Sequence, residues 1–203
     1  MKTKIKIMTW NEYLPLAEKT LSTQFNCEEE FYQKILHAVI GALTEVEEIL
    51  DNYVEGKLIT DVNKQGSIAE ESADIYWYLS VLYRELNIEA ELPLDSTSVI
   101  DQFDIKSPFD ILMKFTKQSL KFLDLLKKKL YYNKPIDNQT MIDLTNNMFN
   151  LLNYYCHVYN TNVSDILDKN IAKLKARYGD KFSSERAINR DLETERNILE
   201  GKQ

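Results

Sequence analysis

The sequence predicts an all-α protein, because its composition and its hydrophobic patterning both favour helices. Only 5 Gly and 4 Pro occur among 203 residues, so few residues interrupt regular structure. Leu, Ile, Glu and Lys recur at the three- and four-residue spacing of amphipathic helices. A chain of this length can bury one sizeable core, so we expect a single helical domain over residues 1–203.

Apolar stripes predict the first two helices. One is expected over about residues 11–23 and a longer one over about residues 29–54. Gly41 lies in the middle of the longer helix, where glycine normally costs stability, and it predicts a close crossing with another helix. Residues 55–66 are expected to form a loop.

Ser67 and Glu70 match a capping box, Ser-x-x-Glu, in which each side chain satisfies a free backbone N–H group of the other residue. The pattern predicts a third helix that begins at Ser67 and ends near Asn87. It also gives Glu70 a structural role. The stretch from there to Lys106 is expected to be an irregular connection.

The second half of the chain is expected to hold three further helices and a polar tail. Ser107 and Pro108 match an N-cap followed by a first-turn proline, which begins a helix. The three helices are expected over about residues 107–132, 139–159 and 164–179, the last capped by Ser164 and ended by Gly179. The polar tail is expected to be a surface helix or a partly ordered arm.

The two pairs of long helices resemble each other, which suggests a duplicated helical hairpin. When residues 42–60 are aligned with 119–137, four acidic positions of the first pair become Phe122, Leu125, Asn147 and Asn150. We therefore expect two tandem hairpins around a four-helix core. The catalytic hairpin and the N-terminal helix would occupy residues 1–99, and a degenerate hairpin with basic C-terminal helices would occupy residues 100–203. A chance match between two amphipathic hairpins is the alternative.

Two carboxylate pairs carry most of the chemical information. Glu45 and Glu48 are three residues apart on one predicted helix, and Glu71 and Asp74 have the same spacing on the next. Residues three apart share a helix face, so antiparallel packing would bring four carboxylates together. Such a cluster repels itself unless a cation neutralises it, and an all-oxygen ligand set favours Mg²⁺ or Mn²⁺. A solvated helix face is the alternative for any single pair.

The segments around these pairs resemble the MazG-like all-α nucleoside triphosphate pyrophosphohydrolases. The signature of that family is ExxE, a spacer of about one to two dozen residues and ExxD, and here residues 49–70 form a spacer of 22 residues. Further matches at residues 10–20 and 170–191 extend the resemblance over nearly the whole chain. Glu47, where many relatives have a small residue, and the insertion over about residues 100–159 depart from the family pattern.

The resemblance implies a MazG-like helical bundle that hydrolyses a nucleoside triphosphate between the α- and β-phosphorus, releasing monophosphate and pyrophosphate. Mg²⁺ would be the cofactor, and Mn²⁺ would be able to replace it. Glu45, Glu48, Glu71 and Asp74 would hold the metal. Glu45 or Glu48 would also act as the general base that takes a proton from the attacking water.

The predicted helix over residues 164–179 offers donors for the substrate phosphates. Lys173 and Arg177 lie four residues apart on one face, with Asn170 and Tyr178 adjacent, although a basic surface stripe is the alternative. Trp77, Tyr78 and Trp10 are candidates for stacking on the nucleobase, with Trp77 preferred, and the alternative is a core aromatic residue.

Charge and composition exclude several other classes of protein. A net charge of -7 argues against a general nucleic-acid binder, which needs basic surface. Neither His37 nor His157 belongs to a Glu-x-x-His motif, as a ferritin-like di-iron bundle would require. A non-enzymatic, metal-dependent nucleotide-binding or sensing module is the remaining alternative.

The sequence also predicts a cytoplasmic protein with no membrane partner. No apolar stretch approaches the 18 residues of a membrane-spanning helix. Cys27 and Cys156 lie far apart and form no CxxC motif, which is typical of reduced thiols. A homodimer is compatible with a helical fold of this kind.

Overall fold

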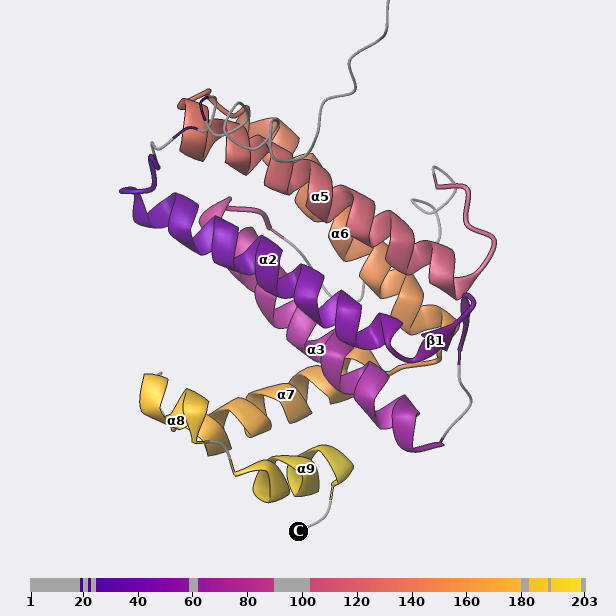
Figure 1. Cartoon of the computed structure of the whole chain (residues 1–203). Coiled ribbons are helices and arrows are strands. Elements are labelled where there is room, and N and C mark those ends of the chain that lie inside the picture. Colours follow the sequence, from indigo (N-terminus) through magenta and orange to yellow (C-terminus); the bar gives the residue numbers. More distant parts are fainter. Residues whose placement is uncertain are drawn as a thin grey trace, which may run out of the picture.

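Helices make up nearly all regular structure in the part of the chain that this computed structural model describes (Figure 1). That part comprises residues 19, 22, 25–58, 62–89, 103–179, 183–189 and 191–201, with only the backbone of 62–67, 184, 187 and 200. The all-α prediction is therefore confirmed. The predicted helix over residues 11–23 and most of the predicted connection 88–106 lie outside the described residues.

A short β-hairpin joins the first two long helices, and helical periodicity did not predict it. Tyr53 pairs with Leu58 across a two-residue turn. Both turn residues, Glu55 and Gly56, adopt positive φ angles of 51° and 74°, as a tight hairpin turn requires. The elements of this region are α2 (Glu30–Leu50), β1 (Tyr53–Val54), β2 (Lys57–Leu58) and α3 (Val62–Glu85).

Two predicted boundaries in this region are wrong. The first long helix ends at Leu50 rather than near Val54, because the chain turns there into the β-hairpin. α3 begins at Val62, inside the predicted loop, so Ser67 lies within the helix and does not begin it. The reason is that an internal glycine such as Gly66 costs only about 1 kcal/mol, which the packing of the later turns outweighs.

α2 and α3 pack antiparallel at very short range. At one end of the pair, the Lys34 ammonium lies 3.2 Å from a Glu85 carboxylate oxygen. In the middle, the Tyr78 ring lies directly on Gly41, where a Cβ atom would come within 2.2 Å of the ring carbons. The close helix crossing predicted at Gly41 is therefore confirmed, and any side chain at this position would force the Tyr78 ring to shift.

Gly41→Ala is expected to destabilise the protein, although alanine is the better helix former. Overpacking costs about 1–3 kcal/mol and the gain in helix propensity is about 1 kcal/mol, so the free energy of unfolding should fall by up to about 2 kcal/mol. Urea unfolding followed by circular dichroism measures the change. An increase in stability by the full propensity gain would show that Tyr78 moves aside without cost.

The second pair of helices follows its predicted boundaries closely. It consists of α5 (Pro108–Tyr132) and α6 (Asn138–Val158). The Ser107 hydroxyl oxygen accepts a hydrogen bond from the Asp110 backbone N–H at 3.2 Å, so the predicted N-cap is confirmed. At the start of α6, the Asp137 carboxylate accepts the Thr140 backbone N–H at 2.9 Å.

The four helices α2, α3, α5 and α6 share one hydrophobic core. In Figure 1, α5 and α6 lie along one side of the α2–α3 pair. Phe122 is fully buried in the core, whereas Asn147 and Asn150 are half-buried on α6. Large side chains that form the centre of the core are Ile35, Ile49, Ile75, Leu79, Phe115, Leu126, Leu151 and Tyr155. The predicted division at residues 99 and 100 lies outside the described residues, and duplication of the hairpin stays a prediction.

The C-terminal helices lie on the other side of the α2–α3 pair (Figure 1). α7 (Val163–Tyr178) begins at Asn162, whose side chain accepts the Asp165 backbone N–H, and not at the predicted cap Ser164. It ends at Gly179, as predicted, with a φ angle of 68°. The polar tail forms two short helices, α8 (Ser184–Ile188) and α9 (Leu192–Glu200). α9 packs against both α7 and α3.

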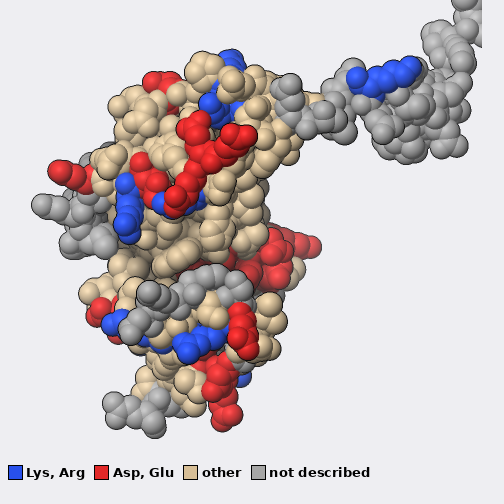
Figure 2. All heavy atoms as spheres, turned by 90° about the vertical axis from the view of Figure 1, so that its left-hand side faces the viewer, with Lys and Arg blue, Asp and Glu red and all other residues tan. Residues whose placement is uncertain are grey.

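The surface carries charges of both signs. Figure 2 shows acidic and basic side chains interspersed on the face that corresponds to the left of Figure 1. Among the helices described, none combines the length and the apolar character needed to cross a bilayer. The cytoplasmic location stays a prediction.

Candidate functional site

Three of the four predicted metal ligands converge where α2 crosses α3. Glu45 from α2 and Glu71 and Asp74 from α3 each place one carboxylate oxygen within 4.8 Å of the others. The i, i+3 spacing on α3 turns two carboxylates toward α2, and the antiparallel register brings Glu45 opposite them. Glu48 is exposed and stands outside this group of three, but its charge acts on both Glu45 and Glu71.

Burial and mutual repulsion hold part of this cluster protonated near neutral pH. Burial, followed by the charges of Asp74 and Glu48, raises the pKa of Glu45 to about 7. Burial, followed by the charges of Glu70 and Glu48, raises the pKa of Glu71 to about 8. A hard divalent cation would relieve this repulsion, and a donor set made only of carboxylate oxygens suits Mg²⁺ or Mn²⁺. The residues present therefore fit the predicted metal.

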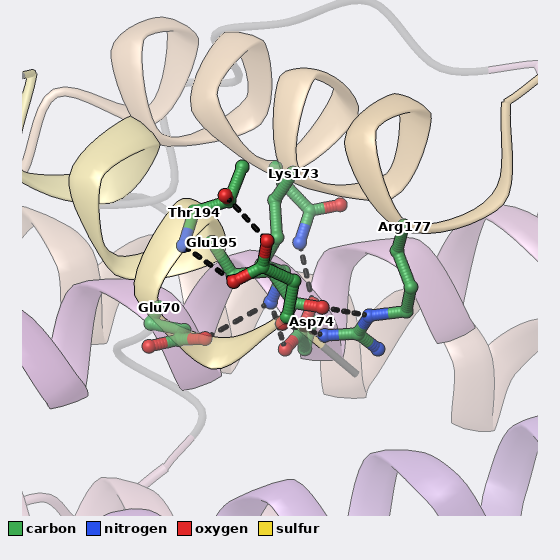
Figure 3. Close-up of polar contacts among 8 residues, drawn as sticks. Glu70, Asp74, Lys173, Arg177, Thr194 and Glu195 are labelled. Carbon is green, nitrogen blue, oxygen red and sulfur yellow. Dashed lines mark hydrogen bonds and ion pairs between the residues drawn. The ribbon is translucent and has the colours of Figure 1, made fainter. Parts of the chain in front are cut away.

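A buried lysine neutralises one side of the cluster. The Lys173 side chain is only 1% exposed, and its ammonium donates to Asp74 at 2.7 Å and to Glu70 at 3.1 Å (Figure 3). Burial alone would lower the pKa of Lys173, but the two carboxylates raise it above its usual value. Lys173 is therefore a charged internal partner of the site, and the alternative of a basic surface stripe is wrong for this residue.

Asp74 is held in place from both sides. The amide nitrogen of Asn170, a residue 3% exposed, donates to one Asp74 carboxylate oxygen at 2.5 Å, and Lys173 donates to the other. Asn170 and Lys173 are three residues apart on α7, so a single helix face provides both contacts. α7 thus orients the carboxylate that the sequence predicts as a metal ligand.

Arg177 lies on the next turn of α7 and binds a carboxylate of the C-terminal tail. Its Nε and Nη2 groups donate to the two Glu195 oxygens at 2.8 Å and 2.6 Å. Its guanidinium group also lies 5.6 Å from the centre of the Tyr178 ring. The predicted phosphate donors thus share one region, but internal carboxylates engage Lys173 and Arg177.

Trp77 lies one helical turn beyond Asp74 on α3, and 38% of its surface is exposed. It is therefore not a core residue, which was the alternative to a role in base stacking. Its ring centre is 4.9 Å from that of Tyr78 and 6.4 Å from that of His37. The three rings form an aromatic group beside the carboxylates, and burial, followed by the charges of Glu45 and Asp74, raises the pKa of Tyr78.

Sequence reasoning missed two residues of the site, Glu70 and Glu195. Glu70 precedes Asp74 by four residues, so helical spacing could have placed it on the same face, but it was assigned to the capping box. Tyr78, a predicted stacking candidate, lies beside Trp77, whereas the candidate Trp10 lies outside the described residues. Glu195 had no local signal, because only the path of the tail brings it to Arg177.

The raised pKa values predict how stability depends on pH in the absence of metal. In the unfolded chain Glu45 and Glu71 ionise near their usual value of 4.5, whereas the folded protein retains protons up to about 7 and 8. The folded state therefore binds more protons in this window, and the free energy of unfolding should fall as the pH rises through it. Urea unfolding in EDTA at about pH 5.5 and about pH 8 tests this expectation.

Two variants serve as controls for the pH dependence. Glu71→Gln should reduce the loss of stability between the two pH values, because one titrating group is gone. Glu47→Gln changes an exposed carboxylate of α2 and should preserve the wild-type difference. Equal pH dependence in the Glu71→Gln and wild-type proteins would contradict the assignment.

Comparisons with known proteins leave the site to be interpreted from its own chemistry. No protein-family model, curated protein or solved structure matches the chain. Membership of the MazG-like pyrophosphohydrolases consequently stays a prediction, which rests on the ExxE and ExxD patterns and the flanking segments described above.

Proposed function

We propose that the protein is a Mg²⁺-dependent nucleoside triphosphate pyrophosphohydrolase of the MazG-like type. It would cleave an NTP or dNTP between the α- and β-phosphorus to give the monophosphate and pyrophosphate. The observation that carries the proposal is the convergence of Glu45, Glu71 and Asp74 at one crossing of two helices, beside the buried Lys173.

The metal would be held by the three carboxylates that converge. A bound Mg²⁺ ion supplies positive charge that stabilises the developing negative charge on the phosphoryl group. Asn170 and Lys173 orient Asp74 toward this role from the α7 side. Because the carboxylates come from two rigid helices, their positions are defined before any ligand arrives.

Glu48 is the better of the two predicted candidates for the general base. Glu45 belongs to the group of three carboxylates and is needed there as a ligand. Glu48 lies one turn further along α2, is exposed to water and is close enough to influence both Glu45 and Glu71. It can therefore accept a proton from water at the edge of the site.

The remaining predicted residues suit the rest of the substrate. Lys173 and Arg177 would supply charged donors, and Asn170 an amide, once substrate phosphates displace the internal carboxylates that these groups now contact. Tyr178 lies against the Arg177 guanidinium. Trp77 offers an exposed aromatic face one turn away, where a nucleobase can stack. In this proposal the triphosphate would lie beside the carboxylates and the base beyond them.

A panel of NTPs and dNTPs with Mg²⁺ tests the proposal, with separate assays of pyrophosphate and monophosphate. Equal amounts of the two products, and their loss in EDTA, are expected. Nucleotide binding without turnover would reject the enzyme and favour the non-enzymatic binding module.

A further inference from the structure

The contact between Arg177 and Glu195 has the geometry of an anion site. The guanidinium group donates through two N–H groups to the two carboxylate oxygens, at 2.8 Å and 2.6 Å. The same two-pronged arrangement is the one in which guanidinium groups bind phosphate. The side chains of Arg177 and Glu195 are only 14% and 5% exposed. The largely desolvated guanidinium group is therefore paired with a carboxylate of the chain itself (Figure 3).

The tail reaches this position through a short helix whose first turn is fixed by a cap. The Asp191 carboxylate accepts the Thr194 backbone N–H and hydroxyl at 3.1 Å and 2.7 Å, which fixes the first turn of α9. Glu195 follows on the next turn and points to Arg177, while Leu192 remains 64% exposed. A helix of only 9 residues opens more easily than the long helices of the core.

The location of the contact links it to the candidate site. Arg177 lies one turn after Lys173 on α7, and Lys173 binds Asp74. α9 packs against α3 as well as α7. It therefore contacts both the helix that bears Glu71 and Asp74 and the helix that bears Lys173 and Arg177. A polyphosphate that reached from the carboxylates to Arg177 would meet the Glu195 carboxylate.

We propose that Glu195 occupies the position of a substrate phosphate on Arg177, and that α9 leaves this position when a polyphosphate binds. The proposal rests on the proposed function for the class of ligand. The exchange replaces one charge-assisted pair at Arg177 by another, so the guanidinium group never remains buried without an anion. Removing the Glu195 charge should therefore raise the affinity for polyphosphate, since the internal competitor is lost.

Inorganic tripolyphosphate with Mg²⁺ is the probe, and its dissociation constant is measured by calorimetry. Glu195→Gln is expected to bind it about tenfold more tightly than the wild type. Glu193→Gln is the matched control, because it changes the net charge equally at an exposed position of α9, and it should bind within about twofold of the wild type. Adding Arg177→Gln to Glu195→Gln should abolish the gain. Unchanged or weaker binding by Glu195→Gln would overturn the proposal.

Hydrogen exchange of the wild-type protein provides a test that needs no variant. Tripolyphosphate should accelerate amide exchange over residues 192–200, because α9 is released from Arg177. Slower or unchanged exchange there would overturn the proposal. Tighter binding by Glu195→Gln without hydrolysis of any nucleotide would reject the proposed function alone, whereas hydrolysis by the wild type without these effects would reject the role of Glu195 alone.

Discussion

Glu45→Gln, Glu71→Gln and Asp74→Asn are each expected to lower nucleoside triphosphate hydrolysis by at least about 100-fold, because each removes a negative oxygen ligand needed for charge stabilisation in the transition state. The three carboxylates meet within 4.8 Å of one another, so each is positioned to offer an oxygen to the same ion. Steady-state release of pyrophosphate at saturating Mg²⁺ measures the effect.

Stability measurements and a matched control variant distinguish a loss of catalysis from a loss of folding. The glutamine variants should be as stable as the wild type or more stable at neutral pH, since they reduce repulsion in the metal-free cluster. Glu47→Gln removes an exposed carboxylate between Glu45 and Glu48 and should keep hydrolysis within about twofold of the wild type. Activity like that of the wild type in Asp74→Asn would reject the metal centre.

Lys173→Met is expected to cause the largest loss of stability among single changes at the site. It leaves Asp74 and Glu70 without the buried ammonium group that now lies 2.7 Å and 3.1 Å away. Removing one partner of a buried ion pair costs about 3–5 kcal/mol, and the partial exposure of both carboxylates places the expected value near about 3 kcal/mol. The melting temperature in EDTA should fall by about 6–12 °C.

The control for this variant is Lys175→Met, on the exposed face of the same helix, which should change the melting temperature by no more than about 2 °C. Mg²⁺ or Mn²⁺ should restore part of the stability of Lys173→Met, because a divalent cation can take over the lost charge. Equal melting temperatures of the Lys173→Met and wild-type proteins in EDTA would contradict the role of Lys173 as the internal cation.

Local sequence signals determined much of the fold. The Ser107–Pro108 start of α5 and the Gly41 crossing were both predictable, because each depends on one local feature of the backbone. The β1–β2 hairpin was not, since Glu55 is an unusual residue for a positive φ angle and hides the turn. The start of α3 at Val62 was missed because tertiary packing outweighed a glycine and a plausible cap.

The candidate site was predictable only where its residues share a helix face. The i, i+3 spacing identified Glu71 and Asp74, and antiparallel pairing then brought Glu45 to them. The burial of Lys173 could not be predicted, because it follows from where α7 packs against α3. The link between Arg177 and Glu195 spans a turn and two short helices, and no periodic pattern encodes it.

Lys173 also bears on how the protein reaches its native state. In many metalloproteins the ligands repel one another until an ion arrives, so folding waits for the metal. Here Lys173 is a counter-ion within the chain itself. Through its contacts with Asp74 and Glu70, α7 can pack on α3 without any bound metal ion. We expect maturation of this protein to be independent of the magnesium supply, with metal loading as a separate and later event.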